Sequence, residues 1–254
     1  MTRVLAFGCH PDDIELMCGG TLALLAGAGC EIHMAIMAGG EMGSTQLPPE
    51  AIREKRLKEA EASAAVLGAK FYFAGGYDIE VDYNADYRRR TIAVMRQASP
   101  DIVLTSPPTD YLIDHEETSR LVRNAAFIAS VPNYDCGHPT APMKKIPHLY
   151  YWNASGLTDI LGRPLPMTGA VDVSSVMETK TKMLACHDSQ RQWLKFINGW
   201  DEYLETMRRT TAQQGQSLGL AAAEQFMQHL GSGHPQDNLL KALLGGRYHD
   251  IPQS

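Results

Sequence analysis

The feature that most constrains the fold is an alternation of short apolar runs with longer helical stretches over the first 130 residues. The apolar runs predict strands at 3–8, 31–37, 70–73 and 101–105. The stretches between and after them are rich in helix-forming residues and predict helices at 14–28, 50–67, 85–98 and 115–130. Strands that alternate with helices form parallel sheets through right-handed crossovers. We therefore predict an α/β fold with a mostly parallel sheet.

The second half of the chain is less regular. A proline-rich loop is expected at 131–146, followed by strands at 148–152 and 169–173. Further helices are predicted at 174–186, 189–212 and 217–230. A length of 254 residues suits one α/β domain. We expect a single domain over 1–254, with a core at 1–190 and a helical C-terminal extension at 191–254 packed on it.

Composition excludes several classes of protein. The net charge of −6 gives no broad basic surface, so nucleic acid and acidic membranes are poor partners. No apolar run reaches the roughly 20 residues that span a bilayer, and the first residues do not resemble a signal peptide. The five cysteines form no C-x-x-C pair, which argues against a disulfide framework or a zinc ribbon. A cytoplasmic protein is expected.

Three polar clusters follow predicted strands directly. They are Cys9–Glu15 after the first strand, Gly40–Ser44 after the second, and Asp110–His115 after the strand at 101–105. In an open parallel sheet, ligands bind beyond the carboxyl ends of the strands. The predicted fold therefore brings these three clusters to one edge of the sheet.

The residue types in these clusters suit metal-assisted hydrolysis. Two imidazoles, from His10 and His115, together with one carboxylate are a common ligand set for catalytic zinc and leave a position open for water. Asp12 and Asp13 are adjacent and point different ways in an extended loop, so one can ligate while the other acts as general base. The same loop could instead cap a helix, with an aspartate at its start and Glu15 in its first turn. Spacing alone leaves both interpretations open.

The ordered motifs resemble the LmbE-like, or PIG-L, N-acetylglucosaminide deacetylases. The matching motifs are His10-Pro11-Asp12-Asp13 with Glu15, Gly19-Gly20, G-E-x-G-S at 40–44, Arg56-x-x-Glu59 with Leu67-Gly68, Asp114-His115, and Lys182 with His187-x-Ser189-Gln190. This likeness spans residues 3 to about 190. It implies a Rossmann-like three-layer sandwich and a mononuclear zinc that serves to remove acetyl groups from amino sugars or related amides.

The resemblance also implies roles for individual residues. His10, Asp13 and His115 match the three zinc ligands, and Asp12 matches the general base. Asp114 is expected to hold an imidazole N–H from outside the metal shell. The candidates for contact with substrate are Glu41, Arg56 and Tyr111, of which Arg56 offers a planar fork for phosphate or sugar hydroxyls.

One position departs from the family. Many members have a histidine where this chain has Leu112, and leucine cannot donate a hydrogen bond to the reacting groups. The proton for the leaving amine must then come from His187, Tyr111 or Asp12. We favour Asp12 as a proton shuttle, with His187 helping to polarise the carbonyl.

The sequence thus predicts a zinc-dependent enzyme that removes an N-acetyl group from a small molecule containing N-acetylglucosamine or a related amide. Iron(II) or cobalt could occupy the same ligands. A hydrolase or lyase acting on a non-sugar amide, and a sugar- or metal-binding module without activity, remain alternatives. A dinucleotide-dependent oxidoreductase is disfavoured, because the first strand is not followed by G-x-G-x-x-G. A homo-oligomer is expected from the family resemblance.

Overall fold

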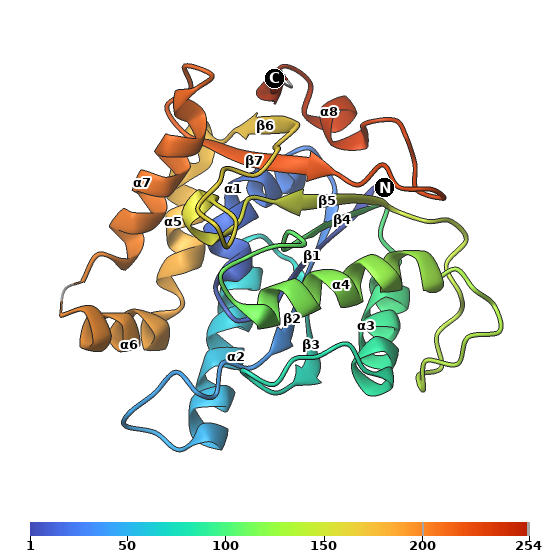
Figure 1. Cartoon of the computed structure of the whole chain (residues 1–254), viewed down its shortest axis with the longest axis horizontal. Coiled ribbons are helices and arrows are strands. Elements are labelled where there is room, and N and C mark those ends of the chain that lie inside the picture. Colours follow the sequence, from blue (N-terminus) through green and yellow to red (C-terminus); the bar gives the residue numbers. More distant parts are fainter. Residues whose placement is uncertain (200, 253–254) are drawn as a thin grey trace.

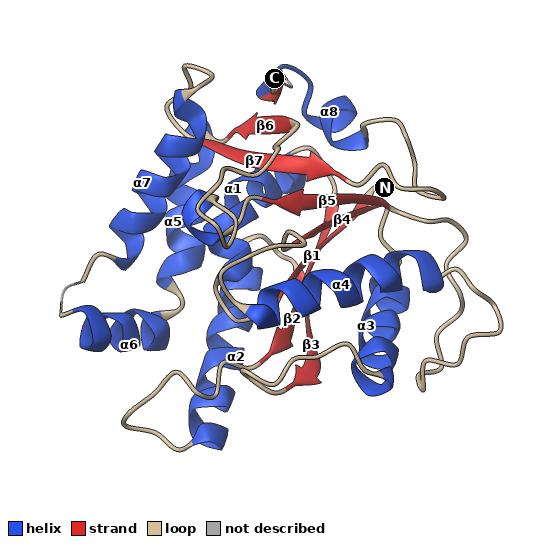
Figure 2. Cartoon of the chain, viewed as in Figure 1, coloured by secondary structure: helices blue, strands red, loops and turns tan. Residues whose placement is uncertain are grey.

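The computed structural model describes residues 1–199 and 201–252 and contains one eight-stranded sheet, in the order β3-β2-β1-β4-β5-β7-β6-β8. Its first five strands are parallel to one another (Figure 2). They are β1 (Arg3–Gly8), β2 (Glu31–Ala38), β3 (Lys70–Gly76), β4 (Ile102–Thr105) and β5 (His148–Trp152). The predicted α/β class with a mostly parallel sheet is confirmed.

Helices cover both faces of this sheet (Figure 1). On one face, Val4 and Ala6 of β1 pack with α1 (Asp13–Gly27), α2 (Pro49–Val66), α5 (Met177–Ala185) and α8 (Leu239–Leu244). On the other face, Leu5 and Phe7 pack with α3 (Ala85–Ala98) and α4 (Ile113–Ile128). Successive side chains of β1 enter opposite cores, as a strand buried on both faces requires. Among the described residues, no helix is long and apolar enough to cross a membrane.

The remaining strands lengthen the sheet in antiparallel fashion. They are β6 (Gly169–Asp172), β7 (Ala223–Gln228) and β8 (Tyr248–Asp250), and β7 pairs with both β5 and β6. The prediction of a helix over 217–230 is therefore wrong, and the extension at 191–254 is only partly helical. The segment contains three Ala, three Leu and two Gln, which favour helices locally, but pairing of β7 on both sides overrides that preference.

The predicted helix at 189–212 is two helices, α6 (Asp188–Asn198) and α7 (Tyr203–Gln216). Gly199 ends α6 with a φ of 78°, a left-handed conformation that glycine adopts without strain. Residue 200, within the predicted range, lies outside the described residues. Short 3-10 turns lie at Ser155–Leu157, Ser174–Val176 and Gly245–Arg247.

A buried ion pair joins the two halves of the sheet at the glycine pair in α1. Glu224 of β7 accepts hydrogen bonds from the backbone N–H groups of Gly20 (2.8 Å) and Thr21 (2.6 Å). Lys180 of α5 donates to the same carboxylate at 2.6 Å, and both charged side chains are fully buried. A Cβ at Gly20 would lie 2.8 Å from Val173, so only glycine allows this approach. The lysine that enters the core is thus Lys180, whereas Lys182, the residue matched to the family motif, is exposed.

Candidate active site

Loops at the carboxyl ends of β1, β2, β3 and β4 meet around a cavity of about 270 Å³. The three predicted polar clusters contribute to it, as expected for an open parallel sheet. The chain folds this way because each cluster follows a short buried strand whose register fixes where the loop begins. The cavity is lined by His10, Asp12, Asp13, Met42, Gly43, Arg56, Asp78, Ile79, Tyr111, Leu112, His115, Gln190 and Trp193.

His10, Asp13 and His115 converge in this cavity as a group that could hold a metal ion. One ligand atom from each residue lies within 4.8 Å of the other two. Nδ1 of His10 lies 3.3 Å from Nε2 of His115, and that same nitrogen of His115 lies 3.6 Å from a carboxylate oxygen of Asp13. Two imidazole nitrogens and one carboxylate oxygen suit zinc in a catalytic site with an open position.

The side-chain atoms of His10, Asp13 and His115 that do not face the candidate metal position contact other residues. Nε2 of His10 lies 2.9 Å from Asp78 and 3.4 Å from Asp114, while Nδ1 of His115 lies 3.3 Å from Asp110. The second oxygen of Asp13 accepts from the backbone N–H groups of Cys9 and His10, both at 2.9 Å. Each imidazole ring therefore presents one defined nitrogen to the candidate metal position, which is the usual arrangement around metal-binding histidines.

Sequence reasoning expected Asp114 in this outer position but gave no role to Asp78 or Asp110. Asp78 lies just after β3, at the same edge of the sheet as the three clusters. Its place after a strand was therefore a signal that could have identified it. Asp78 also accepts from the backbone N–H of Met42 at 3.0 Å, which links the loops after β2 and β3.

The electrostatics of the cavity favour positive charge. Burial alone would lower the pKa of both histidines, but the pKa of His10 lies well above its ordinary value because of Cys9, Asp114 and Asp78. The pKa of His115 is raised by Asp13 and Asp110. Against the opposing effect of burial, the two rings lower the pKa of Asp13. A buried pocket with surplus carboxylates of this kind is suited to a cation.

Asp12 is held next to the proposed ligands in a strained backbone conformation, with a φ of 107°. Its carboxylate accepts a hydrogen bond of 2.6 Å from the hydroxyl of Tyr203, which comes from α7. Burial, with the neighbouring Asp13, raises the pKa of Asp12 to about 6. A group with a pKa near neutrality can both take and return a proton. Tyr203 was missed by sequence reasoning, because nothing local connects it to a site 191 positions away.

Arg56 and Tyr111, both predicted to contact substrate, line the cavity. The guanidinium of Arg56 is buried, donates to the backbone oxygen of Gly40 at 2.8 Å and pairs with the side chain of Gln190. Its Nε has no hydrogen-bond partner among the described residues. Tyr111 is 68% exposed and its ring meets that of His115 edge-on, with centroids 5.4 Å apart. Arg56 is therefore not an ordinary surface charge on a helix.

Two residues that were predicted to act on or contact the substrate, Glu41 and His187, do not line the cavity. Glu41 is buried, with Arg53 as the nearest cation at 3.8 Å. His187 is buried against Glu15, with Nε2 of the ring 3.0 Å from the carboxylate. The Glu15 carboxylate also accepts a hydrogen bond from Ser63 at 2.5 Å. In this arrangement His187 supports α1, and its predicted action on substrate stays a prediction.

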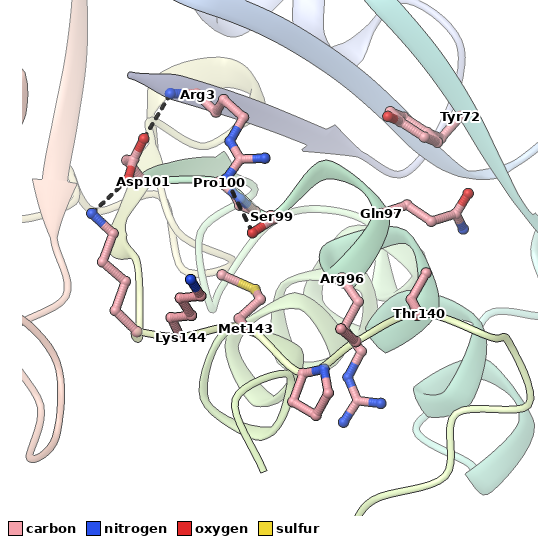
Figure 3. Close-up of a pocket in the computed structure, with 13 residues that line it drawn as sticks. Arg3, Tyr72, Arg96, Gln97, Ser99, Pro100, Asp101, Thr140, Met143 and Lys144 are labelled. Atoms are coloured by element: carbon pink, nitrogen blue, oxygen red, sulfur yellow. Dashed lines mark hydrogen bonds and ion pairs between the residues drawn. The ribbon is translucent and has the colours of Figure 1, made fainter. Parts of the chain in front are cut away.

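A larger cavity, of about 850 Å³, lies at the amino ends of β1 and β4, opposite the carboxyl ends that surround the candidate site (Figure 3). Its basic residues largely have partners already: Arg3 donates to Ser99, Lys145 pairs with Asp101 at 2.6 Å, and Arg96 donates to backbone oxygens of Ala129 and Val131. It contains neither histidine nor a pair of carboxylates. The candidate metal ligands and the candidate general base therefore all line the smaller cavity.

Comparison with known proteins agrees with this location. The family model described as GlcNAc-PI de-N-acetylase, PIG-L, matches residues 5–126, which hold all three proposed metal ligands. Residues 5–126 belong to the PIG-L family. The family resemblance predicted from the motifs is thereby confirmed.

Two relatives with named activities align with most of this chain. A diacetylchitobiose deacetylase from Thermococcus kodakarensis is 28% identical over 220 residues, which cover 81% of this chain and 76% of that protein. A 4-oxalmesaconate hydratase from Pseudomonas putida is 24% identical over 233 residues, covering 88% and 85%. The solved N,N'-diacetylchitobiose deacetylase of Pyrococcus horikoshii has the same fold, with a TM-score of 0.75, 24% identity, and coverage of 94% of this chain and 88% of that one.

Proposed function

We propose that this PIG-L protein is a zinc-dependent deacetylase that removes an N-acetyl group from a small molecule containing N-acetylglucosamine or a related amide. The observation that carries the proposal is the convergence of His10, Asp13 and His115 beside the buried carboxylate of Asp12. The family match and the deacetylase relative support the same reaction class. Burial and ordered outer partners distinguish this cluster from a solvated group of acids.

The roles of the residues follow from their positions. A zinc ion held by His10, Asp13 and His115 would supply a Lewis acid that polarises the amide carbonyl and lowers the pKa of water. Asp12 takes a proton from the attacking water and returns it to the nitrogen of the leaving amine. This shuttle replaces the donor that Leu112 cannot provide. Arg56 and Tyr111, which line the cavity, contact and orient the substrate.

Acetate release from acetylated amino sugars tests the proposal directly. The purified protein is assayed as isolated, after chelation, and after zinc is returned, with metal content measured in each sample. We expect activity to be lost and restored with the metal. Full activity in protein shown to be free of metal would overturn the mechanism. A panel of acylated amino compounds separates a sugar substrate from a non-sugar amide.

A second candidate is addition of water to a carbon–carbon double bond, which is favoured by the likeness to the hydratase. Because Leu112 stands in place of the family histidine, the site lacks one group that could protonate a leaving amine. A hydration reaction releases no amine and does not need that proton donor. Loss of ultraviolet absorbance from an unsaturated carboxylic acid, with no acetate formed, would favour this reaction.

A binding module without activity would bind ligand equally well in wild type and Asp12→Ala and turn over nothing.

We also propose a homo-oligomer. Ile160 and Leu161, in the segment between β5 and β6, are 68% and 69% exposed, and adjacent exposed apolar residues suit a contact between copies of the chain. Sedimentation of the wild-type protein and of Ile160→Ser with Leu161→Ser measures the oligomeric state. A monomeric wild type would contradict the proposal.

A further inference from the structure

A second cavity, of about 150 Å³, adjoins the candidate active site. The two cavities share Gly43 and Trp193 in their walls. The rest of the second cavity is formed by the loop after β2, the first turns of α2, and α6. A molecule bound at His10 and Asp12 that extends past Trp193 would therefore enter it.

The walls of this second cavity differ in chemistry from those of the first. Its apolar wall residues are Leu47, Ile52, Trp193 and Phe196, and Lys55 is the only charged residue among those described. The other side chains in its wall are polar and uncharged: Ser44, Thr45, Gln46, Ser189 and Gln192. Trp193 and Phe196 have nearly parallel rings, at 18° with centroids 6.1 Å apart. Phe196 is 67% exposed and Leu47 is 42% exposed. The candidate metal-binding cavity has three aspartates and two histidines in its wall, whereas this one has no acid or histidine among its described residues and contains two stacked aromatic rings.

From this contrast we propose that the second cavity is a subsite for a flat apolar group, such as an aryl ring, attached to the substrate beyond its acetamido sugar. The inference rests on the proposed deacetylase function and specifies its substrate class. A volume of about 150 Å³ is enough for a group the size of benzene. Aromatic rings in offset contact attract one another beyond the effect of buried area. The substrate would thus be amphiphilic, with its amide at Asp12 and its apolar group between Leu47 and Phe196.

The test compares kcat/KM for acetate release from the phenyl and the methyl glycosides of N-acetylglucosamine. In wild type we expect the phenyl glycoside to be preferred by about tenfold, mainly through a lower KM. Phe196→Ala should bring the ratio of the two values close to one. Ile197→Ala is the matched control, because Ile197 is the next residue on α6, is 54% exposed and does not line the cavity. This control should keep the wild-type ratio.

The failure of the subsite and the failure of the deacetylase proposal give different results. Turnover of both glycosides with equal kcat/KM would overturn the subsite and leave the deacetylase intact. Equal preference for N,N'-diacetylchitobiose and the phenyl glycoside would also overturn it, because a second sugar would then bind as well as an apolar ring. If neither glycoside is hydrolysed, calorimetry with phenyl and methyl glucosaminide still measures the subsite. Tighter binding of the phenyl compound to wild type but not to Phe196→Ala supports it, and equal binding contradicts it.

Discussion

The parallel half of the sheet and its antiparallel half use buried polar groups differently. At the carboxyl ends of β1 to β4, polar side chains line a cavity and present nitrogen and oxygen atoms that could bind a ligand. In the antiparallel half, Glu224 of β7 accepts hydrogen bonds from Lys180 and from the backbone of α1, and none of the cavities described lies beside it. The same residue types therefore carry chemistry in one half and hold the layers together in the other.

Three side chains from the second half of the chain nevertheless contact residues in or beside the site. Tyr203 donates to Asp12, Gln190 pairs with Arg56, and His187 faces Glu15 beside the first turn of α1. None of the three is among the proposed metal ligands. Residues 5–126 thus contain the proposed metal ligands and the proposed base, while side chains of the later helices contact the base and its neighbours.

The largest effect is expected for Asp12→Asn. The amide keeps the size of the side chain and can still accept from Tyr203, but it cannot take a proton from water. We expect kcat to fall by about 10²–10⁴-fold. Metal content, measured by elemental analysis, should stay near that of wild type, whereas His115→Ala should lose the metal together with the activity. An Asp12→Asn enzyme that retains its rate would remove Asp12 from the mechanism.

Much of the parallel half could be predicted, because its signals are local. The strands at 3–8 and 31–37 are apolar throughout, and the polar residues that follow them are placed by the chain itself. His10, Asp13 and His115 were predicted as ligands because their clusters follow strands and because their motifs resemble those of the PIG-L family.

The supporting residues could not be predicted in this way. Tyr203 meets Asp12 only because α7 packs beside β7, a strand whose helix-favouring composition hid it. Lys180 and Lys182 lie two positions apart, and only packing against Glu224 shows which one is buried. Where a contact depends on which strands are neighbours, no pattern along the sequence specifies it.

Lys180→Met tests the structural use of charge in the antiparallel half. It leaves the Glu224 carboxylate buried without its cation, and removal of one partner from a buried pair costs about 3–5 kcal/mol. We expect the free energy of unfolding in urea to fall by that amount. Lys182→Met is the control, since Lys182 is exposed and pairs only with Glu178, and it should change stability by less than about 0.5 kcal/mol. Similar losses for both variants would show that the buried pair has no special role.

Tyr203→Phe tests whether the second half positions the base. It removes only the hydroxyl that donates to Asp12, at 2.6 Å. A hydrogen bond to a charged group contributes about 1.5–3 kcal/mol, so we expect kcat to fall by roughly tenfold or more with KM little changed. Tyr151→Phe is a suitable control, because its hydroxyl contacts His229 instead of the active site. A change in KM alone would assign Tyr203 to substrate binding.

The smallest effect is a pH dependence of stability through His187 and Glu15. Although burial alone would lower it, the pKa of His187 lies above its ordinary 6.5 because of Glu15, so its contribution is complete below pH 6.5 and is lost as pH rises through the folded value. The pKa of Glu15 lies below its ordinary 4.5 because His187 outweighs burial, so its contribution is complete above pH 4.5 and is lost as pH falls through the folded value.

The difference in free energy of unfolding between wild type and His187→Gln should therefore be greatest between pH 4.5 and 6.5 and shrink on either side. His33→Gln gives the opposite trend as a control. Burial lowers the pKa of His33, so the contribution of its neutral ring is present above pH 6.5 and lost as pH falls. Urea unfolding at a series of pH values measures both differences. If the His187→Gln difference were independent of pH, the ring would be neutral in the folded protein, and its role beside α1 would be packing without charge.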